Sequence, residues 1–240
     1  MNRLFALSRV VASRYVVLWF LVLVSLALPR RSSGQCTMEW LDGMELAGAD
    51  RTVYASTVWD PPGPVGAQLV IAGELSIVGK LNAASIASLD LVTGEWRTLG
   101  TGIAGTVYCL AVSPAGDLLV GGSFGFAGDL PISGIARWNG TTWSPLGQGT
   151  NGSVLSMAFL PNGNLVAVGS FTLAGGQAAN CVAQWNGTAW SPLGTGTLST
   201  VRAVTALPNG DIIVGGEFTN IGGVNANRVA RWNGSTWSAM

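Results

Sequence analysis

The sequence contains no histidine among its 240 residues. This absence excludes Ser-His-Asp and Cys-His nucleophilic centres, in which an imidazole takes the proton from the nucleophile, and metal sites that are built on histidine. Paired carboxylates could still act as acid and base, but the acidic residues are scattered along the chain. We therefore predict no catalytic residues, no cofactor-binding residues and no metal ligands.

Cysteine and charge are also scarce. Cys36, Cys109 and Cys181 form no Cys-x-x-Cys motif, so neither a redox pair nor a zinc site is indicated. One disulfide among them is possible in an oxidising compartment, and it would leave one thiol over. Asp, Glu, Lys and Arg make up 10% of the chain, against about 25% in an average domain. Because there is no run of Lys or Arg, we predict no nucleic-acid partner.

The first 34 residues differ in composition from the rest. Three arginines precede the apolar run Tyr15–Leu28, which is too short to span a bilayer comfortably, and small or polar residues follow. This pattern predicts a secretory signal peptide with cleavage before Gln35; an uncleaved N-terminal anchor is the alternative. Removing residues 1–34 takes away five arginines and no acidic residue, which leaves 7 basic and 12 acidic residues and a net charge of −5. We expect a secreted or cell-surface protein with no stable membrane span after cleavage.

What the sequence does contain is a repeat of 47 residues. Large apolar residues recur at this spacing: Trp138, Trp185 and Trp232; Phe124, Phe171 and Phe218; and Val107, Val154 and Val201. A fixed period in this range marks a repeat architecture, in which each copy is one supersecondary unit that cannot bury its apolar face alone. We predict a signal peptide (1–34), a lead-in (35–52) and repeats over 53–240. The copies are 53–106, which is longer and degenerate, 107–153, 154–200 and 201–240.

Each copy contains four short apolar runs that are divided by turn signals. Asn-Gly separates the third run from the fourth at three places: Asn139-Gly140, Asn186-Gly187 and Asn233-Gly234. Asn-Gly favours a two-residue type I′ hairpin, because both residues tolerate positive φ. Four strands of 5–8 residues then make an antiparallel meander, and apolar residues nowhere keep helical spacing over 11 or more positions of the mature chain.

The prediction is an all-β fold, a β-propeller of four-stranded antiparallel blades with essentially no helix. The fourth copy should end at residue 247, whereas the chain stops at Met240. Four copies lie at the lower end of the usual blade number, so we expect an incomplete ring and suspect a longer reading frame.

Six tryptophans hold fixed places beside the predicted hairpin turns: Trp138, Trp143, Trp185, Trp190, Trp232 and Trp237. Stacking on sugar rings is one interpretation. Packing between blades is the stronger one, because burying about 150–250 Å² per ring at about 25 cal/mol/Å² contributes roughly 4–6 kcal/mol. We assign these tryptophans a structural role, together with the three phenylalanines and the three Asn-Gly pairs given above.

Two other repeated patterns have a structural and a functional interpretation. Gly121-Gly122 and Gly215-Gly216 precede neither GK[ST] nor a helix, so they indicate a bulge or a close backbone approach rather than a phosphate loop. Asp117, Asn164 and Asp211 share one repeat position just after a turn. A ring of such oxygens could bind Ca²⁺, but a polar residue there more often satisfies the backbone of the turn.

Four Asn-Gly-Thr/Ser triplets match the N-glycosylation sequon, at Asn139, Asn151, Asn186 and Asn233. Turn chemistry alone generates most of these matches, so glycosylation depends on a host that modifies secreted proteins.

The copies resemble a known kind of repeat. The segment Leu207–Phe218, followed by Val229–Trp237, resembles the delta-60-type and kelch-like propeller repeats of large secreted bacterial proteins, and it is similar to the repeats of fungal cortical polarity markers. In the degenerate copy, Leu89–Trp96 resembles the Asp-x-x-Thr-Gly-x-Trp turn of a kelch blade. The resemblance implies a secreted or surface-exposed propeller and no particular activity. Kelch-like copper-radical oxidases need histidine ligands, and the arginine triad of sialidases cannot be placed here.

The function that these observations favour is binding. The loops 125–134, 173–180 and 219–227 carry one charged side chain, Asp129, and no two acids stand at matching positions in adjacent copies. We expect an interaction scaffold with an unknown protein or carbohydrate partner. A structural surface-array protein is the first alternative, and a carboxylate-dependent hydrolase or lyase is the second.

Overall fold

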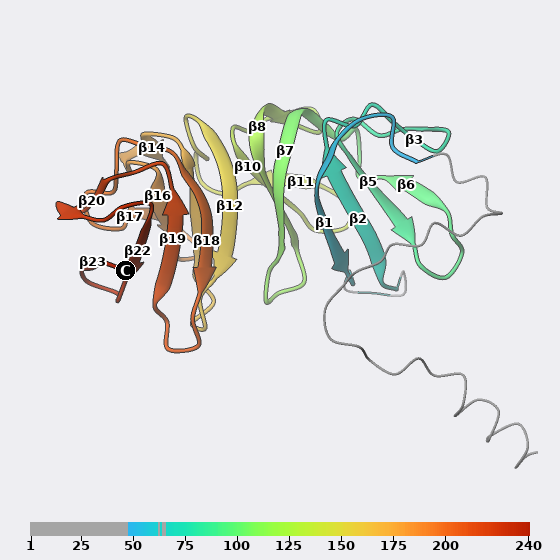
Figure 1. Ribbon diagram of the computed structural model, residues 1–240. Helices are drawn as coiled ribbons and strands as arrows, with labels where there is room; N and C mark the ends of the chain where they lie inside the picture. The colour runs from blue at the N-terminus through green and yellow to red at the C-terminus, as the bar shows by residue number, and fades with distance from the viewer. Residues whose placement is uncertain (1–47, 62, 64–65) are drawn as a thin grey trace, which may run out of the picture. The chain divides into compact units, whose positions relative to one another are not determined.

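The computed structural model describes residues 48–61, 63 and 66–240. The predicted signal peptide, its cleavage site, Cys36 and most of the lead-in lie outside these residues. Among the described residues there is no helix, and the strands form successive antiparallel sheets (Figure 1). The all-β prediction is therefore confirmed.

Four sheets follow one another along the chain, and in each the strands are paired in chain order. Blade 1 contains β1 (Val53–Trp59), β2 (Gln68–Gly73), β5 (Ile86–Asp90) and β6 (Trp96–Thr98). Blade 2 contains β7 (Ile103–Val112), β8 (Leu118–Ala127), β10 (Ile135–Trp138) and β11 (Trp143–Pro145), with β9 (Leu130–Pro131) paired to β8. Blade 3 contains β12 (Ser153–Phe159), β13 (Leu165–Ser170), β16 (Val182–Trp185) and β17 (Trp190–Pro192). Blade 4 contains β18 (Val201–Ala206), β19 (Ile212–Gly216), β22 (Val229–Trp232) and β23 (Trp237–Ala239).

The two ends of each sheet differ in the length of the connections that they carry, and we call them the turn end and the loop end. The turn end carries the connections from first to second strand, which in blades 2 to 4 are 113–117, 160–164 and 207–211. It also carries those from third to fourth strand (91–95, 139–142, 186–189, 233–236). The loop end carries the longer connections from second to third strand. Three of these contain a small hairpin of their own: β3 (Ile77–Val78) with β4 (Leu81–Asn82), β14 (Leu173–Ala174) with β15 (Gln177–Ala178), and β20 (Asn220–Ile221) with β21 (Val224–Asn225).

The Asn-Gly hairpins form, but the predicted two-residue type I′ turn is wrong. Trp138 pairs with Trp143, so the loop has four residues, and Asn139 is not among the residues with positive φ. Its side-chain Oδ1 instead accepts the backbone N–H groups of Thr141 and Thr142, at 2.9 and 2.8 Å. This Asx turn replaces the backbone geometry of a type I′ turn, because the asparagine side chain supplies the acceptor at an ordinary φ. Strand lengths also differ from the predicted 5–8 residues, since fourth strands such as Trp96–Thr98 have 3 residues and β7 has 10.

Every first strand contains a β-bulge opposite a glycine of the second strand. The pairing shifts after Val53, Val107, Val154 and Val201, each of which faces a glycine: Gly73, Gly122, Gly169 and Gly216. A Cβ on any of these four glycines would overlap with the backbone carbonyl of the residue before the valine. The bulge predicted from the glycine doublets is therefore present, and it needs glycine because the backbones approach so closely.

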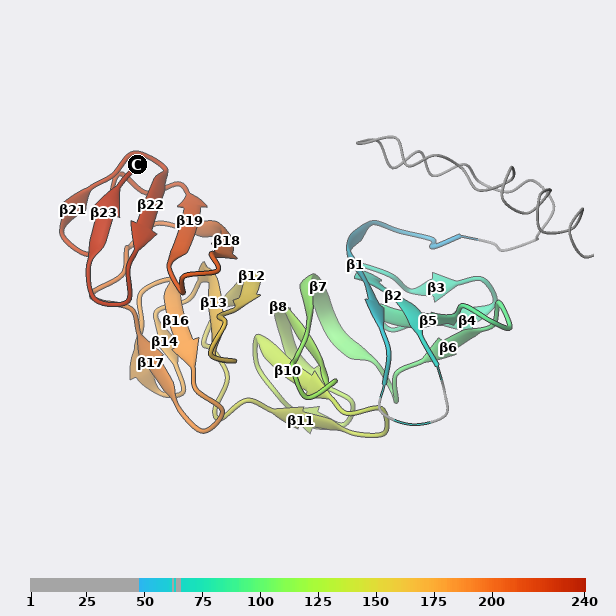
Figure 2. The same cartoon turned by 90° about the horizontal axis from the view of Figure 1, so that it is seen from below.

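The core lies within the blades and between consecutive ones. The first strands of consecutive blades lie side by side, β1 with β7, β7 with β12 and β12 with β18 (Figure 2). Buried side chains from neighbouring blades form shared clusters, as Trp59 of blade 1 and Trp138 of blade 2 do. Among the described residues no strand pairing or hydrogen bond joins blade 1 to blade 4, so these four blades do not close a ring.

Candidate functional site

The bulges present two side chains from each blade at its loop end. The extra residue of each bulge is Tyr54, Tyr108, Leu155 or Arg202, and the residue after each bulge glycine is Glu74, Ser123, Ser170 or Glu217. We call these eight side chains the bulge array. None of the eight residues is buried, and all four that follow the glycines are exposed. A bulge re-aims a side chain by adding one residue to one strand, so the array is set by backbone pairing rather than by loop conformation.

In blades 1 and 2 the array is aromatic. The Tyr54 hydroxyl donates to Glu74 Oε1 at 3.3 Å, and the Tyr54 and Tyr108 ring centroids lie 5.5 Å apart at an interplanar angle of 60°. Desolvation, followed by the neighbouring Glu74 carboxylate, raises the pKa of the Tyr54 phenol above its usual range. Tyr54 is exposed and Tyr108 is half-buried, so the tilted pair offers an apolar surface that is only partly open to solvent.

In blade 4 the array is ionic. Arg202 Nε donates to Glu217 Oε1 at 2.9 Å, and Arg202 Nη2 contacts the same oxygen. Arg228 also contacts this residue, because its Nη1 donates to the Glu217 backbone carbonyl at 2.7 Å. The array thus runs from aromatic residues in blades 1 and 2 to a charged pair in blade 4.

Arg228 also occupies a strained backbone position. It has a φ of 71°, and the equivalent residues of the other blades, Ser85, Gly134 and Cys181, have φ values of 67°, 70° and 64°. A left-handed conformation favours glycine, and only blade 2 has glycine there. Strain of this kind persists where the surrounding structure enforces it, here at the start of the third strand beside the array.

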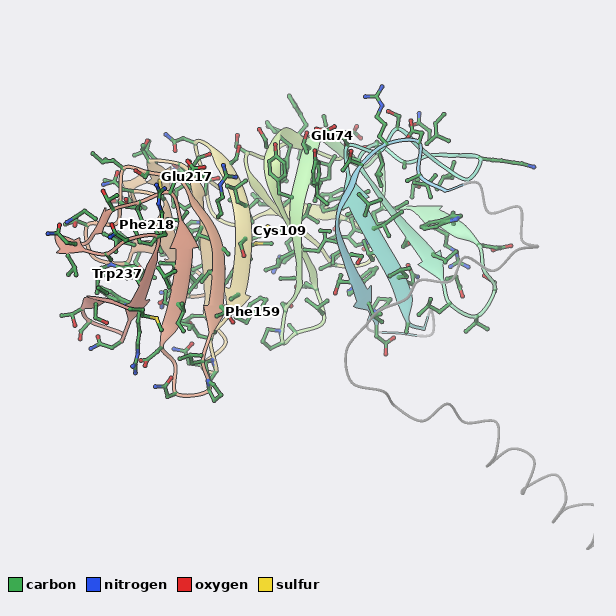
Figure 3. All side chains as sticks on the ribbon, viewed as in Figure 1. Glu74, Cys109, Phe159, Glu217, Phe218 and Trp237 are labelled. Carbon is green, nitrogen blue, oxygen red and sulfur yellow. The ribbon has the colours of Figure 1, made fainter. Side chains whose placement is uncertain are left out.

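The two acids of the array each bond to a partner within their own blade. Glu74 and Glu217 occupy the same repeat position, but they belong to blades 1 and 4, and each already bonds to its own partner. Figure 3 shows both at the loop end of their sheets, whereas Phe159 lies at the turn end. Two acids that work as a pair must flank one reacting bond, about 5–9.5 Å apart. The eight side chains supply aromatic, aliphatic, hydroxyl and charged groups at the loop end.

Two hollows lie between blades at the loop end, and Ser123 of the array lines the first of them. One of about 370 Å³ lies between blades 2 and 3 and is lined by Ser123, Thr150 and Asn151, among others. Another of about 400 Å³ lies between blades 3 and 4 beside Asn180 and Thr197. The first is lined mainly by hydroxyl, amide and backbone groups, whereas the lining of the second also includes the apolar side chain of Leu198.

The residues to which the sequence analysis gave structural roles lie elsewhere, in the blades. Trp143, Trp190 and Trp237 are 6% exposed, and each indole Nε1 donates to a carbonyl of the preceding blade, Leu99, Leu146 or Leu193, at 2.8–2.9 Å. Trp138, Trp185 and Trp232 pack against them with ring centroids 5.0–5.5 Å apart. Phe124, Phe171 and Phe218 are buried in the cores. None of these residues belongs to the bulge array.

The polar repeat position Asp117, Asn164 and Asp211 does not converge on one point. Each residue lies at the turn end of its own sheet, and no group of three metal-ligating side chains occurs in the part of the chain that the structure describes. Arg137 faces Asp117 at 3.7 Å, and Arg231 Nε donates to Asp211 at 2.8 Å. These acids take part in local cross-strand pairing within their blades.

The pairing of Asp211 gives a testable pH dependence. Hydrogen bonds from Arg231 and then Asn209 hold the pKa of this buried carboxylate below its ordinary value. Its contribution to stability is therefore full above about pH 4 and is lost as the pH falls through the folded-state pKa. We expect Asp211→Asn to be less stable than the parent chain near pH 7 and to lose that difference in acid. Denaturant unfolding of both proteins at several pH values measures it, and a constant difference would contradict the assignment.

The cysteines and the sequons add no reactive centre among the described residues. Cys109 and Cys181 are free, and burial raises the pKa of the Cys109 thiol to about 12 and also raises that of Cys181. A thiol with a raised pKa is a poor nucleophile. Asn139, Asn186 and Asn233 form exposed Asx turns, and Asn151 bonds to Thr172.

Sequence reasoning missed the bulge array, although a signal was present. Gly73 precedes Gly122 by 49 residues rather than 47, so the match between Glu74 and Glu217 disappears when only the regular period is followed. Aligning the copies on the bulge glycine would have placed both acids at equivalent positions, whereas the equivalence of Tyr54 and Tyr108 depends on the strand register.

Blades of four antiparallel strands, joined in series through inter-blade tryptophans, define a β-propeller domain. A family model of the Rax2 C-terminal beta propeller domain matches residues 108–240, and the chain belongs to this family. A β-propeller domain of this kind fits an interaction scaffold. Within the described residues, no helix has the length and hydropathy that crossing a membrane requires.

The chain is similar to solved structures at low sequence identity, and the first of them shows the same fold. The WD40 repeats of RRP9 are 15% identical, with a TM-score of 0.52, over 80% of this chain and 52% of that one. Virginiamycin B lyase from Staphylococcus aureus is 14% identical, with a TM-score of 0.49, over 81% of this chain and 57% of that one. The chain thus spans about half the length of these structures, and the similarity concerns the fold alone. No curated protein matches the sequence.

Proposed function

We propose that this protein is a secreted or cell-surface interaction scaffold, of the delta-60 or kelch-like type, that binds a protein or carbohydrate partner at the bulge array. The observation that carries the proposal is the contrast between repeated and varied positions. The bulge valines and glycines are the same in all four blades, whereas the array beside them changes from tyrosine to leucine to arginine.

Such a pattern suits recognition. The repeated residues hold four backbones in one geometry, and the varied side chains then present a surface that differs from blade to blade. Exposed tyrosines and arginines are enriched where binding energy is concentrated in protein interfaces. The apolar leader before Gln35 and the mature net charge of −5 support export, and no basic surface for nucleic acid is proposed.

The experiment compares binding by variants of the bulge array with binding by a control variant at the turn end, all made in the mature protein. Immobilised peptides and soluble polysaccharides are the probes, and Tyr54→Ser with Tyr108→Ser removes the aromatic half of the array. We expect at least a tenfold loss of affinity for the probes that bind, and no change in Thr188→Ala, which alters an exposed turn at the other end. Unchanged binding in the array variant would overturn the proposal, as would retention of the full-length chain in the cytoplasm of its host.

A further inference from the structure

At the turn end, the side chain of Trp59 fills the crevice between blades 1 and 2. Trp59 is the last residue of β1, it is 3% exposed, and its indole Nε1 donates to the Gly116 carbonyl of blade 2 at 2.7 Å. The ring edge faces Gly140 in the next turn of that blade, 3.9 Å from where a Cβ would stand. Blade 1 thus inserts an indole between two turns of blade 2.

The equivalent position in the other blades is smaller. Trp59 pairs with Gln68 across the first and second strands of blade 1. In blades 2 and 3 the corresponding pairs are Ser113 with Asp117 and Leu160 with Asn164, so Ser113 and Leu160 are the equivalents of Trp59. Leu160 is partly buried against the core that it shares with blade 4. Ser113 is therefore the one small residue among the three positions that face a following blade.

A hollow of about 470 Å³ occurs where the small residue stands, between blades 2 and 3. Its lining includes Gly163 and Gly187, one period after the two glycines that hold Trp59, and Ser113, Leu146, Phe159 and Trp185. This volume falls within the range of roughly 300–1,000 Å³ for ligand pockets, which are mostly apolar with a few placed polar groups. Asp117 and Arg137 supply polar groups at the same hollow.

Two further details match an unfilled indole site. The Gly163 carbonyl accepts no hydrogen bond from any residue that the structure describes, whereas its counterpart Gly116 accepts the Trp59 indole. Trp138, which shares a buried cluster with Trp59, is 6% exposed, and its counterpart Trp185 is only half-buried. The hollow therefore offers an acceptor and an aromatic wall that the molecule leaves uncovered.

We infer that the crevice between blades 2 and 3 binds a tryptophan side chain of a partner polypeptide, with the indole N–H on the Gly163 carbonyl. The internal occupant of the equivalent crevice enters from the end of an extended strand, so an extended partner segment crossing the turn end presents the same group in the same way. Tryptophan is a frequent anchor of protein interfaces, because it fills a pocket at a low cost in side-chain entropy. The site lies at the opposite end of the sheets from the bulge array. Its test therefore does not depend on whether the bulge array binds a partner.

The test uses the mature protein and three capped pentapeptides that carry Trp, Phe or Ala between glycines. Backbone amide shifts are followed by NMR, and the Trp peptide is expected to shift Gly163, Asn164 and Gly187. Ser113→Trp, which supplies the indole from the chain itself, should weaken that binding at least tenfold. Ser191→Trp adds the same ring on the exposed face of β17 and should leave it unchanged.

Each other outcome contradicts the inference. Equal shifts with the Phe peptide would mean that the indole N–H is not recognised. Shifts at these amides with glucose or cellobiose and none with the Trp peptide would make the hollow a carbohydrate site. If Ser113→Trp does not fold, the map of shifts in the parent protein decides, because shifts that avoid Gly163 and Gly187 would overturn the proposal.

Discussion

The Trp190→Ala variant is expected to lose about 3–5 kcal/mol of unfolding free energy. Trp190 is 6% exposed, its Nε1 donates to the Leu146 carbonyl of the preceding blade at 2.8 Å, and its ring packs on Trp185. Truncation would remove a large buried apolar group from the contact between blades 2 and 3. It would also leave a buried carbonyl without its donor.

Two controls separate these effects. Trp190→Phe keeps an aromatic ring but lacks the N–H, so it should cost about 1–3 kcal/mol, the penalty of one unsatisfied buried group. Leu198→Ala removes a side chain that is 90% exposed and should change stability by less than about 0.5 kcal/mol. Urea unfolding followed by circular dichroism measures all three. A loss of under about 1 kcal/mol for Trp190→Ala would show that this ring does not hold the blades together.

The blade architecture could be predicted from the sequence because its determinants are local. The 47-residue spacing, the Asn-Gly dipeptides and the alternating apolar runs each lie within one copy. The turn type could not be predicted from Asn139-Gly140 alone. Whether asparagine turns by its own φ or through its side chain depends on whether the amides of Thr141 and Thr142 reach its Oδ1, and that is a property of the whole loop.

The bulge array and the crevice at Ser113 needed pairing information that the sequence does not display. Which residue is extra in a bulge depends on the register between two strands, and Tyr54 and Tyr108 become equivalent only when that register is known. The first copy also shifts by 49 residues at one strand and by 54 at another. That shift hides the correspondence between Trp59 and Ser113, so the contrast between a filled and an empty crevice is visible only in three dimensions.

The second large effect is expected at a bulge glycine, with its chain neighbour as the control. A Cβ on Gly216 would overlap with the Thr200 carbonyl, so Gly216→Ala must push two strands of blade 4 apart. Gly215, one residue earlier in β19, has only the Arg228 carbonyl near its Cβ position, at 3.8 Å. Gly216→Ala should therefore lose about 3 kcal/mol of stability, the upper range for overpacking. Gly215→Ala should gain about 0.5–1 kcal/mol, because alanine loses less backbone entropy than glycine on folding.

The two variants are expected to change stability in opposite directions. The comparison therefore tests whether the bulge that positions the array depends on glycine. Both variants add one methyl group to the same strand, so a general sensitivity of blade 4 to substitution would destabilise both. If only Gly216→Ala is destabilised in urea unfolding, the bulge depends on the close approach of backbones that glycine permits. Because Arg202 and Glu217 flank that approach, the same variant should also displace their ion pair, and a crystal structure with the pair unchanged would separate the array from the bulge.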